Sequence, residues 1–271
     1  MYDPVCGMDV TGLKSKFCSP VCERRFRRDP KRFSGEPLIK LRNLRKTFDT
    51  GGVKTPVLRG IDLNVWAGDF VAIIGASGSG KSTCLNMIGL LERPTSGQIF
   101  LRGRDVSQLS EDERAEIRAK TYGFVFQQYH LIPWLNAYDN IALPLIFAGR
   151  LVDRGDLEKH FRELGLEERM DHRPFELSGG EQQRVAMLRA MANNPDIILG
   201  DEPTGNLDSV TGKKLLELLH HLNKDDKKTL VVVTHDEEVA AQADQVITLK
   251  DGLQIRNHGI HKIYTEKHHA A

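Results

Sequence analysis

A glycine-rich stretch that ends in a lysine and two hydroxyl residues carries the clearest chemical signal in the sequence. The stretch reads Gly75-Ala76-Ser77-Gly78-Ser79-Gly80-Lys81-Ser82-Thr83. It follows an apolar run at 70–74 and leads into a helix-forming segment, an order that directs backbone N–H groups at an anion. Lys81 would reach the β- and γ-phosphates of a nucleotide, and the Ser82 hydroxyl would bind Mg²⁺. The stretch therefore predicts a binding site for a nucleoside triphosphate, ATP.

Two adjacent carboxylates, Asp201 and Glu202, follow the apolar run at 197–199. We expect Asp201 to hold Mg²⁺, mostly through water, and Glu202 to orient and deprotonate the attacking water. His235 ends a further apolar run at 229–234. A lone histidine after a strand is usually structural, but ligands gather at the carboxyl edge of a parallel sheet, so we expect a catalytic role.

A second anion cradle is predicted at Ser178-Gly179-Gly180, where Ser178 and Glu181 form a capping box at a helix start. Two glycines at a helix N-terminus are unusual for a structural cap alone, and their N–H groups suit an anion. Phe48 lies among the early strands. Its ring would either stack on an adenine or join the core, and the sequence leaves both interpretations open.

The surrounding pattern is that of an α/β protein. Strands are expected at 38–41, 62–65, 95–101 and 123–126, with a turn at Gly51-Gly52 and a closing hairpin at 246–255. Residues 128–177 have helical patterning instead, which predicts an inserted helical subdomain.

We therefore expect three parts: a cysteine-containing N-terminal segment at 1–35, a main domain at 36–260 with its helical subdomain at about 128–190, and a polar tail at 261–271. The histidines near the end of the chain are expected to lie in solvent rather than to bind metal. They are His258, His261, His268 and His269.

Composition excludes several classes of protein. The 271 residues include 38 Lys or Arg and 37 Asp or Glu, a balance that argues against a nucleic-acid partner. No apolar run approaches the length of a membrane-spanning helix, and the N-terminus lacks a signal-peptide pattern, so we expect a soluble, cytoplasmic chain. Four cysteines do not make a disulfide framework, and a reducing compartment favours free thiols or metal ligands.

Three of the cysteines, Cys6, Cys18 and Cys22, lie in the N-terminal segment. A segment this short buries little apolar surface by itself, so a metal ion is a reasonable way to hold it together. Four positions apart, Cys18 and Cys22 are expected on one face of a helical turn, with Cys6 brought in by the preceding loop.

This segment resembles a YHS metal-binding module of the kind appended to copper-transporting ATPases. The matching residues are Asp3-Pro4-Val5-Cys6-Gly7-Met8, Phe17-Cys18-Ser19, Cys22, Phe26 and Asp29-Pro30. The spacing between Cys6 and Cys18 is shorter than usual in the module, and its Tyr and His are missing. The resemblance implies Cu(I) or Zn²⁺ at Cys6, Cys18 and Cys22, and ordinary free thiols are the alternative.

Taken in order, the motifs of residues 38–257 resemble those of an ATP-binding-cassette (ABC) ATPase. The resemblance assigns Walker A to Gly75–Thr83, the Q-loop to Gln127, the signature to Leu177–Glu181, Walker B to Ile197–Asp201, the catalytic carboxylate to Glu202, the D-loop to Gly205–Asp208 and the switch histidine to His235. It implies a RecA-like P-loop core with an antiparallel β subdomain and an inserted helical subdomain.

The resemblance also implies the site. ATP would contact Phe48, the Walker A residues, Ser178-Gly179-Gly180 and Asp208, while Ser82, Gln127 and Asp201 hold Mg²⁺ and Glu202, His235, Gln127 and Lys81 are catalytic. The family further implies a head-to-tail homodimer, in which the signature of one copy meets ATP held by Lys81 of the other.

Segments 124–131 and 201–208 resemble one branch, that of the macrolide-export, lipoprotein-release and cell-division ATPases. This implies a permease partner with few transmembrane helices, an adaptor in the periplasm for export systems, and a peripheral location on the cytoplasmic face of the inner membrane. We expect the ATPase subunit of an envelope export or lipoprotein-release system, with a link to metal handling. The alternative is a regulatory ATPase that controls cell-wall remodelling through a membrane partner and transports nothing.

Overall fold

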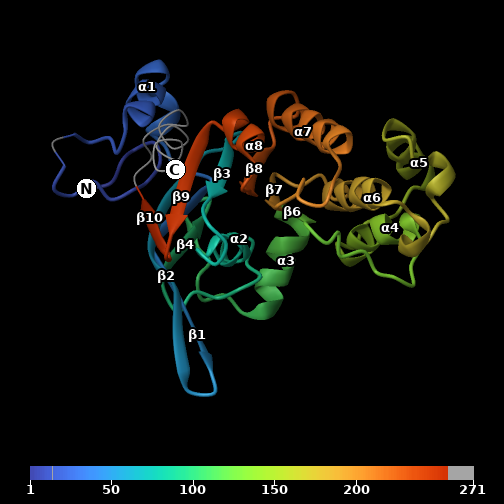
Figure 1. Ribbon diagram of the computed structural model, residues 1–271, viewed down its shortest axis with the longest axis horizontal. Helices are drawn as coiled ribbons and strands as arrows, with labels where there is room; N and C mark the ends of the chain where they lie inside the picture. Colours follow the sequence, from blue (N-terminus) through green and yellow to red (C-terminus); the bar gives the residue numbers. More distant parts are fainter. Residues whose placement is uncertain (14, 256–271) are drawn as a thin grey trace, which may run out of the picture. The chain divides into compact units, whose positions relative to one another are not determined.

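The computed structural model of the protein describes residues 1–13 and 15–255, and it separates into two compact units. Unit 1 comprises residues 1–110 together with the chain from residue 231 onward, and unit 2 comprises residues 111–230. Figure 1 labels their helices and strands. Residues 256–260 of the expected main domain and the expected tail at 261–271 lie outside the described residues, and with them His258, His261, His268 and His269.

Unit 1 combines an antiparallel sheet with part of a parallel one. Its elements are α1 (Pro20–Arg28), the 3₁₀ turn η1 (Lys31–Phe33), β1 (Ile39–Thr50), β2 (Val53–Val65), β3 (Phe70–Ile74), α2 (Lys81–Ile88), β4 (Ser96–Leu101), β5 (Arg104–Asp105), α8 (Glu237–Gln242), β9 (Gln245–Lys250) and β10 (Leu253–Ile255). Strand β8 (Thr229–Val233) begins in unit 2 and continues into unit 1.

The antiparallel sheet has the strand order β2-β1-β4-β5. Strands β1 and β2 form a long hairpin (Figure 1) in which Thr50 pairs with Val53. Gly51 and Gly52 make the turn with φ of +61° and +88°, a conformation that matches the twist of a hairpin and favours glycine. The predicted strands and turn are confirmed, and both strands are longer than the sequence pattern indicates.

Strand β3 is buried along its whole length, which explains its unbroken apolar sequence. It pairs in parallel with β9, Val71 opposite Gln245 and Ile74 opposite Thr248. On the β8 side, the Thr234 N–H donates to the Ile73 carbonyl. Strand β10 turns back on β9 and confirms the predicted terminal hairpin.

Unit 2 is mainly helical. Its elements are α3 (Glu111–Thr121), β6 (Tyr122–Phe126), α4 (Ala137–Phe147), α5 (Arg154–Glu163), the 3₁₀ turns η2 (Glu167–Arg169) and η3 (Pro174–Glu176), α6 (Gly179–Met191), β7 (Ile197–Asp201) and α7 (Ser209–Lys224). Helices α4, α5 and α6 share one apolar core around Phe161, Leu166 and Val185. Residues 128–177 contain helices and no strand, as the sequence predicts.

The N-terminal segment folds around its own small core. That core contains Val5, Cys6, Met8, Cys22, Phe33 and Trp66. One expectation is wrong: Cys18 lies ahead of α1, because Ser19 caps the helix and Pro20 begins it, so Cys18 and Cys22 do not share a helical face. Within the described residues, no helix combines the length and apolar character needed to cross a membrane.

Packing of β6 on α6 leaves no room for a side chain at Gly123, so we predict that Gly123→Ala destabilises the protein. A Cβ there would lie 2.2 Å from the Ala190 carbonyl oxygen, and such overpacking costs about 1–3 kcal/mol. In contrast, a Cβ on Gly212 of α7 meets nothing within 4 Å. Gly212→Ala should therefore raise the free energy of unfolding by about 0.5–1 kcal/mol. Urea unfolding measures both changes, and equal stabilities would contradict the packing described here.

Candidate functional site

The glycine loop of unit 1 connects β3 to α2 in a conformation that only glycines adopt easily. Gly75, Gly78 and Gly80 have φ of +154°, +77° and +97°. At Gly75 the backbone is also crowded, because a Cβ would lie 2.2 Å from the Leu249 carbonyl oxygen. The loop is thus a tight backbone cradle at the start of a helix, the arrangement that suits a phosphate chain.

Two polar groups inside this loop fit an anion. The Lys81 side chain is buried, and its Nζ folds back to donate to the Ala76 carbonyl at 3.1 Å. The Ser79 hydroxyl is buried and finds no hydrogen-bond partner among the residues that the structure describes. Ser82 follows in the first turn of α2 and is exposed. Since a buried cation and an unsatisfied donor are costly without a partner, this donor set fits bound phosphate.

His235 lies at the same sheet edge as this loop. It directly follows the segment in which the Thr234 N–H bonds to Ile73 of β3, so the carboxyl ends of β3 and β8 are neighbours. The residue is exposed, and the next one, Asp236, caps α8 by accepting from the Glu238 N–H. The structure therefore brings His235 to the edge where the sequence predicts it.

In unit 2, the parallel pair β6 and β7 brings Gln127 and Glu202 together. Phe126 is opposite Asp201 in the register, so the next residue on each strand lies just beyond the sheet edge. Both side chains converge on Gly205: a Cβ there would lie 3.1 Å from Gln127 Nε2 and 3.4 Å from Glu202 Oε2. Glu202 has φ of +46°, and its carbonyl accepts from the Gly205 N–H at 3.0 Å, which fixes this sharp turn.

The predicted capping box at the second cradle is confirmed. The Ser178 N–H and hydroxyl both donate to Glu181 Oε2 at 2.8 Å, while Arg169 Nε donates to the other Glu181 oxygen at 2.8 Å. These three donors lower the pKa of the Glu181 carboxyl to about 2, Arg169 being the strongest cause. Ser178 and Gly179 at the start of α6 stay exposed.

The other two predicted ATP contacts, Phe48 and Asp208, lie on separate units. Phe48 of β1 is 37% exposed, with Lys46 Nζ 4.7 Å from its ring centroid, so the ring is not a buried core residue. Asp208 precedes α7 and accepts from both the backbone N–H and the hydroxyl of Thr211.

Sequence reasoning missed Arg189, which connects the signature helix α6 to the segment after Gln127. Its guanidinium donates to the Tyr129 carbonyl at 2.7 Å and to the His130 carbonyl at 2.5 Å. Both of these residues have positive φ, +60° and +48°, a strained pair that needs such support. Burial lowers the pKa of Arg189. Nothing in the sequence around Arg189 distinguishes it from other helical arginines.

The three N-terminal cysteines come together in one cluster with Asp3. Their sulfur atoms and an Asp3 oxygen all lie within 4.8 Å of one another, with Sγ–Sγ distances of 3.3 Å for Cys6–Cys18 and 3.6 Å for Cys18–Cys22. We call these four residues the thiol cluster. The two neighbouring thiols donate to Cys18 and lower its pKa, so the cluster favours a thiolate at that position.

Asp3 is the member that the sequence analysis did not single out. It is fully buried, and its two oxygens accept from three backbone N–H groups, those of Val5 at 2.8 Å, Cys6 at 3.4 Å and Cys18 at 2.6 Å. The carboxylate thereby ties the loop that carries Cys6 to the segment that carries Cys18. Its position three residues before Cys6 was the available signal.

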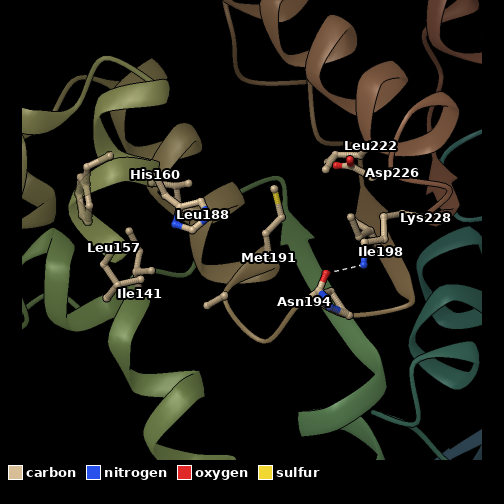
Figure 2. Close-up of a pocket in the computed structure, with 13 residues that line it drawn as sticks. Ile141, Leu157, His160, Leu188, Met191, Asn194, Ile198, Leu222, Asp226 and Lys228 are labelled. Atoms are coloured by element: carbon tan, nitrogen blue, oxygen red, sulfur yellow. Dashed lines mark hydrogen bonds between the residues drawn. The ribbon is translucent and has the colours of Figure 1, made fainter. Parts of the chain in front are cut away.

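A separate cavity of about 500 Å³ lies in unit 2 (Figure 2). Apolar side chains such as Leu157, Leu188, Met191 and Leu222 line it, and Lys228 at its side donates to Asn194 Oδ1 at 2.6 Å. None of the lining residues belongs to the predicted nucleotide site. This cavity and the predicted phosphate site are therefore in different places.

Comparison with known proteins decides the family. A family profile described as "ABC transporter" matches residues 58–205, more than half of the chain. The chain belongs to the ABC transporter family. The match includes the glycine loop, Gln127, the signature and both carboxylates, so the expected α/β ABC ATPase fold and ATPase class are confirmed. It does not reach residues 1–35, and the resemblance of that segment to a YHS module gains no support from it.

Individual relatives agree with this ABC assignment. The chain is 50% identical over 222 residues to the uncharacterized ABC transporter ATP-binding protein MJ0796 of Methanocaldococcus jannaschii, covering 79% of this chain and 94% of the relative. It is 48% identical over 219 residues to the macrolide export ATP-binding/permease protein MacB of Wolinella succinogenes, covering 80% of this chain and 34% of the relative. The chain thus spans about a third of the length of the MacB relatives it matches.

Solved structures of ABC cassettes match as well. A dimeric structure of MJ0796 in a post-hydrolysis state with ADP and Pi has a TM-score of 0.75 and 46% sequence identity. It covers 82% of this chain and 99% of the solved chain. The RecA-like core, antiparallel sheet and helical region expected from the sequence therefore have a direct structural counterpart.

The low pKa of Glu181 leads to a pH-dependent prediction. Because its folded pKa of about 2 lies below the ordinary 4.5, its stabilising contribution is present above pH 4.5 and is lost as the pH falls toward 2. Glu181→Gln should therefore lower the free energy of unfolding at pH 6, with a deficit that shrinks toward pH 3. Urea unfolding across this range, with Glu163→Gln as the control, measures the effect. A deficit that is equally large at pH 6 and pH 3 would contradict it.

Proposed function

We propose that this chain is the ATP-hydrolysing subunit of an envelope export or lipoprotein-release system and drives a separate membrane permease. The observation that carries the proposal is the glycine loop, a cradle of three left-handed glycines around a buried Lys81. A buried lysine without a carboxylate partner in the loop fits the phosphates of ATP as its counter-charge.

Within this proposal, Gly75–Thr83 hold the phosphates of ATP, and Phe48 stacks on its adenine. Ser82, Gln127 and Asp201 would hold Mg²⁺, and its charge would offset that of the phosphates. The register that sets Gln127 beside Glu202 supports their acting on the same reacting group.

Glu202 then accepts a proton from a water molecule. The water oxygen attacks the γ-phosphorus and the bond to the oxygen bridging the β- and γ-phosphates breaks, giving ADP and phosphate. His235 and Lys81 donate hydrogen bonds to the γ-phosphate as charge moves to it.

Dimerisation is part of the proposal. Two copies of the chain would close head to tail, with Ser178-Gly179-Gly180 and Asp208 of one copy against ATP held by the other. The exposed start of α6 and the similarity to the dimeric MJ0796 structures support this arrangement.

We infer that the work of the dimer is done through an integral membrane permease with few transmembrane helices, together with a periplasmic adaptor in an export system. The similarity to MacB proteins, whose name joins an ATP-binding part to a permease, supports this partner. The chain would then sit peripherally on the cytoplasmic face of the inner membrane. Gln127 and the strained Tyr129–His130 pair, held by Arg189, would pass closure of the dimer to the permease.

Replacing the catalytic carboxylate tests the hydrolysis step. Glu202→Gln removes the base and leaves the phosphate-binding residues intact, so we expect ATPase turnover to fall at least about 100-fold while ATP still binds. Size-exclusion chromatography with ATP should show a dimer of this variant. The same substitution at the exposed Glu163 serves as the control. Normal turnover in Glu202→Gln would refute the role of this residue.

The permease partner is tested with the same variant. Glu202→Gln, held as a dimer in ATP, is used to capture proteins from solubilised membranes. We expect a permease with few spans and a large outer domain to co-purify. Recovery of no membrane protein with a verified ATP-bound dimer would contradict the transport role.

We also propose that the thiol cluster binds a soft metal ion, Cu(I) in preference to Zn²⁺, which links the ATPase to metal handling. The short distances between the sulfur atoms support the proposal: Cys18 Sγ lies 3.3 Å from Cys6 Sγ and 3.6 Å from Cys22 Sγ. Asp3 already accepts three backbone N–H bonds, so its oxygens are less available as a fourth ligand. A three-thiolate set without a free fourth ligand suits Cu(I) better than tetrahedral Zn²⁺.

Metal titration of the full chain tests this site. We expect one Cu(I) per chain, competing with a chromophoric chelator under anaerobic conditions, and loss of that binding in the Cys6, Cys18 and Cys22 triple Ser variant. Cys84→Ala, which removes the buried fourth cysteine, is the matched control and should keep the stoichiometry. Equal chelator competition by the triple variant would rule out the site.

A further inference from the structure

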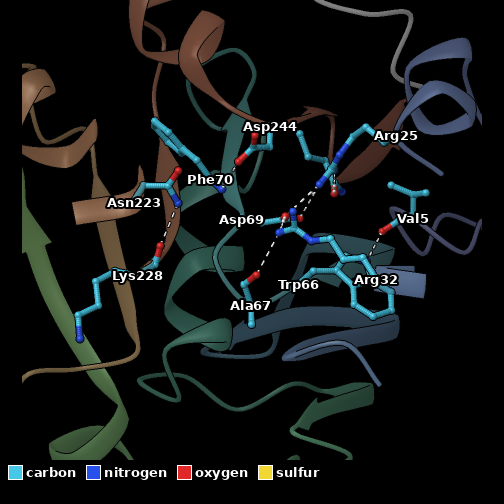
Figure 3. A network of polar contacts seen from close by, with 11 residues as sticks. Val5, Arg25, Arg32, Trp66, Ala67, Asp69, Phe70, Asn223, Lys228 and Asp244 are labelled. Carbon is cyan, nitrogen blue, oxygen red and sulfur yellow. Dashed lines mark hydrogen bonds and ion pairs between the residues drawn. The ribbon is translucent and has the colours of Figure 1, made fainter. Parts of the chain in front are cut away.

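The N-terminal segment is attached to the rest of unit 1 through a buried carboxylate, Asp69, in the turn that precedes β3. Arg25 of α1 donates to both oxygens of Asp69 at 2.9 and 3.0 Å, and Arg32 donates to one of them at 2.6 Å (Figure 3). Asp69 is fully buried, with 0% of its side chain exposed. Because an unpaired buried charge is costly, its position depends on these two arginines.

Aromatic and backbone contacts complete the attachment. Trp66 Nε1 donates to the Val5 carbonyl at 2.7 Å, and the ring of Phe33 meets the Trp66 ring edge to face at 5.3 Å. The Cys6 carbonyl accepts from the Asn64 N–H at 2.7 Å. A residue of the thiol cluster therefore bonds directly to the end of β2.

Three strands of unit 1 contact this segment at one end and the glycine loop at the other. Strand β2 bonds to Cys6 near its end, while Leu58 farther back packs on Gly80, whose added Cβ would lie 2.7 Å from the leucine Cδ2. Strand β3 begins directly after Asp69 and ends directly before Gly75. The strands thus lead from the thiol cluster to the glycine loop.

Strand β9 makes the third connection. Arg25 Nη1 donates to Oε1 of Gln245, the first residue of β9. Near the other end of β9, the Leu249 carbonyl oxygen lies so close to Gly75 that an added Cβ would be only 2.2 Å from it. One guanidinium therefore contacts the residue before β3 and the first residue of β9, while Gly75 directly follows β3 and lies against Leu249 near the end of β9. A shift of α1 would therefore move the strands that border Gly75, the most crowded position of the glycine loop.

We propose that a soft metal ion in the thiol cluster raises the affinity of the glycine loop for ATP, by holding α1 and its Arg25 against the starts of β3 and β9. The inference rests on the proposed metal site. Cys22 lies on α1 one turn before Arg25, whereas Cys6 and Cys18 come from the preceding loops. A metal ion bonded to all three fixes the helix to those loops, in addition to the Arg25–Asp69 ion pair and the small apolar core that hold it otherwise.

The experiment compares the apo and Cu(I)-loaded full chain in equilibrium binding of a fluorescent, non-hydrolysable ATP analogue. We expect Cu(I) to tighten analogue binding about fivefold or more, the usual size of coupling between two sites. Cu(I) binding is followed separately by chelator competition and by emission of the buried Trp66, whose ring packs in the same core as Cys6. A rise in melting temperature is no substitute, because any bound ligand produces one.

Variants of α1 and of the following 3₁₀ turn η1 test the route through Asp69. Arg25→Gln should still bind Cu(I) but show analogue affinity that no longer depends on metal. Arg32→Gln removes the more exposed of the two arginines that pair with Asp69. It should weaken the dependence of analogue affinity on the metal, and it replaces Arg25→Gln as the test if that variant does not fold. Arg27→Gln is the control: Arg27 lies on α1 like Arg25 but pairs with the exposed Glu23, so this variant should behave like the unaltered chain.

The possible outcomes test separately the metal site, its coupling to ATP affinity and the route through Asp69. If the unaltered chain binds Cu(I) and its analogue affinity changes less than twofold, the coupling is wrong and the metal site stands. If no Cu(I) binds, both are wrong. If the metal effect persists in both Arg25→Gln and Arg32→Gln, the route through Asp69 is wrong.

Discussion

The arrangement of unit 1 depends on one buried ion pair network, Asp69 between Arg25 and Arg32. Burial raises the pKa of the Asp69 carboxyl and the two guanidiniums oppose that rise, so the carboxylate is tolerated only while they are in place. Removing one partner from a buried charge is far more destabilising than replacing the whole network by apolar groups. This constraint makes the N-terminal segment part of the ATPase unit rather than an appendage, since the turn that starts β3 needs its arginines.

The positions of the predicted site residues follow from strand direction within each unit. Parallel strands end at the same edge, so in unit 1 the ends of β3 and β8 deliver the glycine loop and His235, and in unit 2 the ends of β6 and β7 deliver Gln127 and Glu202. Backbone with positive φ, at Gly75 and Gly80 in unit 1 and at Glu202 in unit 2, then turns the chain sharply after these strands. Membership of the ABC transporter family fits this use of strand ends for phosphate chemistry.

Local patterns allowed the core of the fold and the nucleotide site to be predicted from the sequence, because each signal spans only a few residues. The glycine loop, the capping box of Ser178 and Glu181 and the terminal hairpin are of this kind. Contacts between distant residues were not predictable. Arg25 and Asp69 are 44 residues apart, and Arg189 reaches a carbonyl 60 residues away. Cys18 was placed on a helix because spacing alone does not show that Ser19 and Pro20 begin it.

Hydrogen exchange of the full chain, with and without Cu(I), measures most directly whether the N-terminal segment and the phosphate cradle act together. Amide protection reports local opening along the chain, so it separates the segment from the strands it contacts. We expect Cu(I) to slow exchange in residues 2–10 and 17–28 and also in β3, the start of β9 and residues 75–83. Protection confined to the N-terminal segment, with unchanged exchange in β3 and the glycine loop, would contradict it.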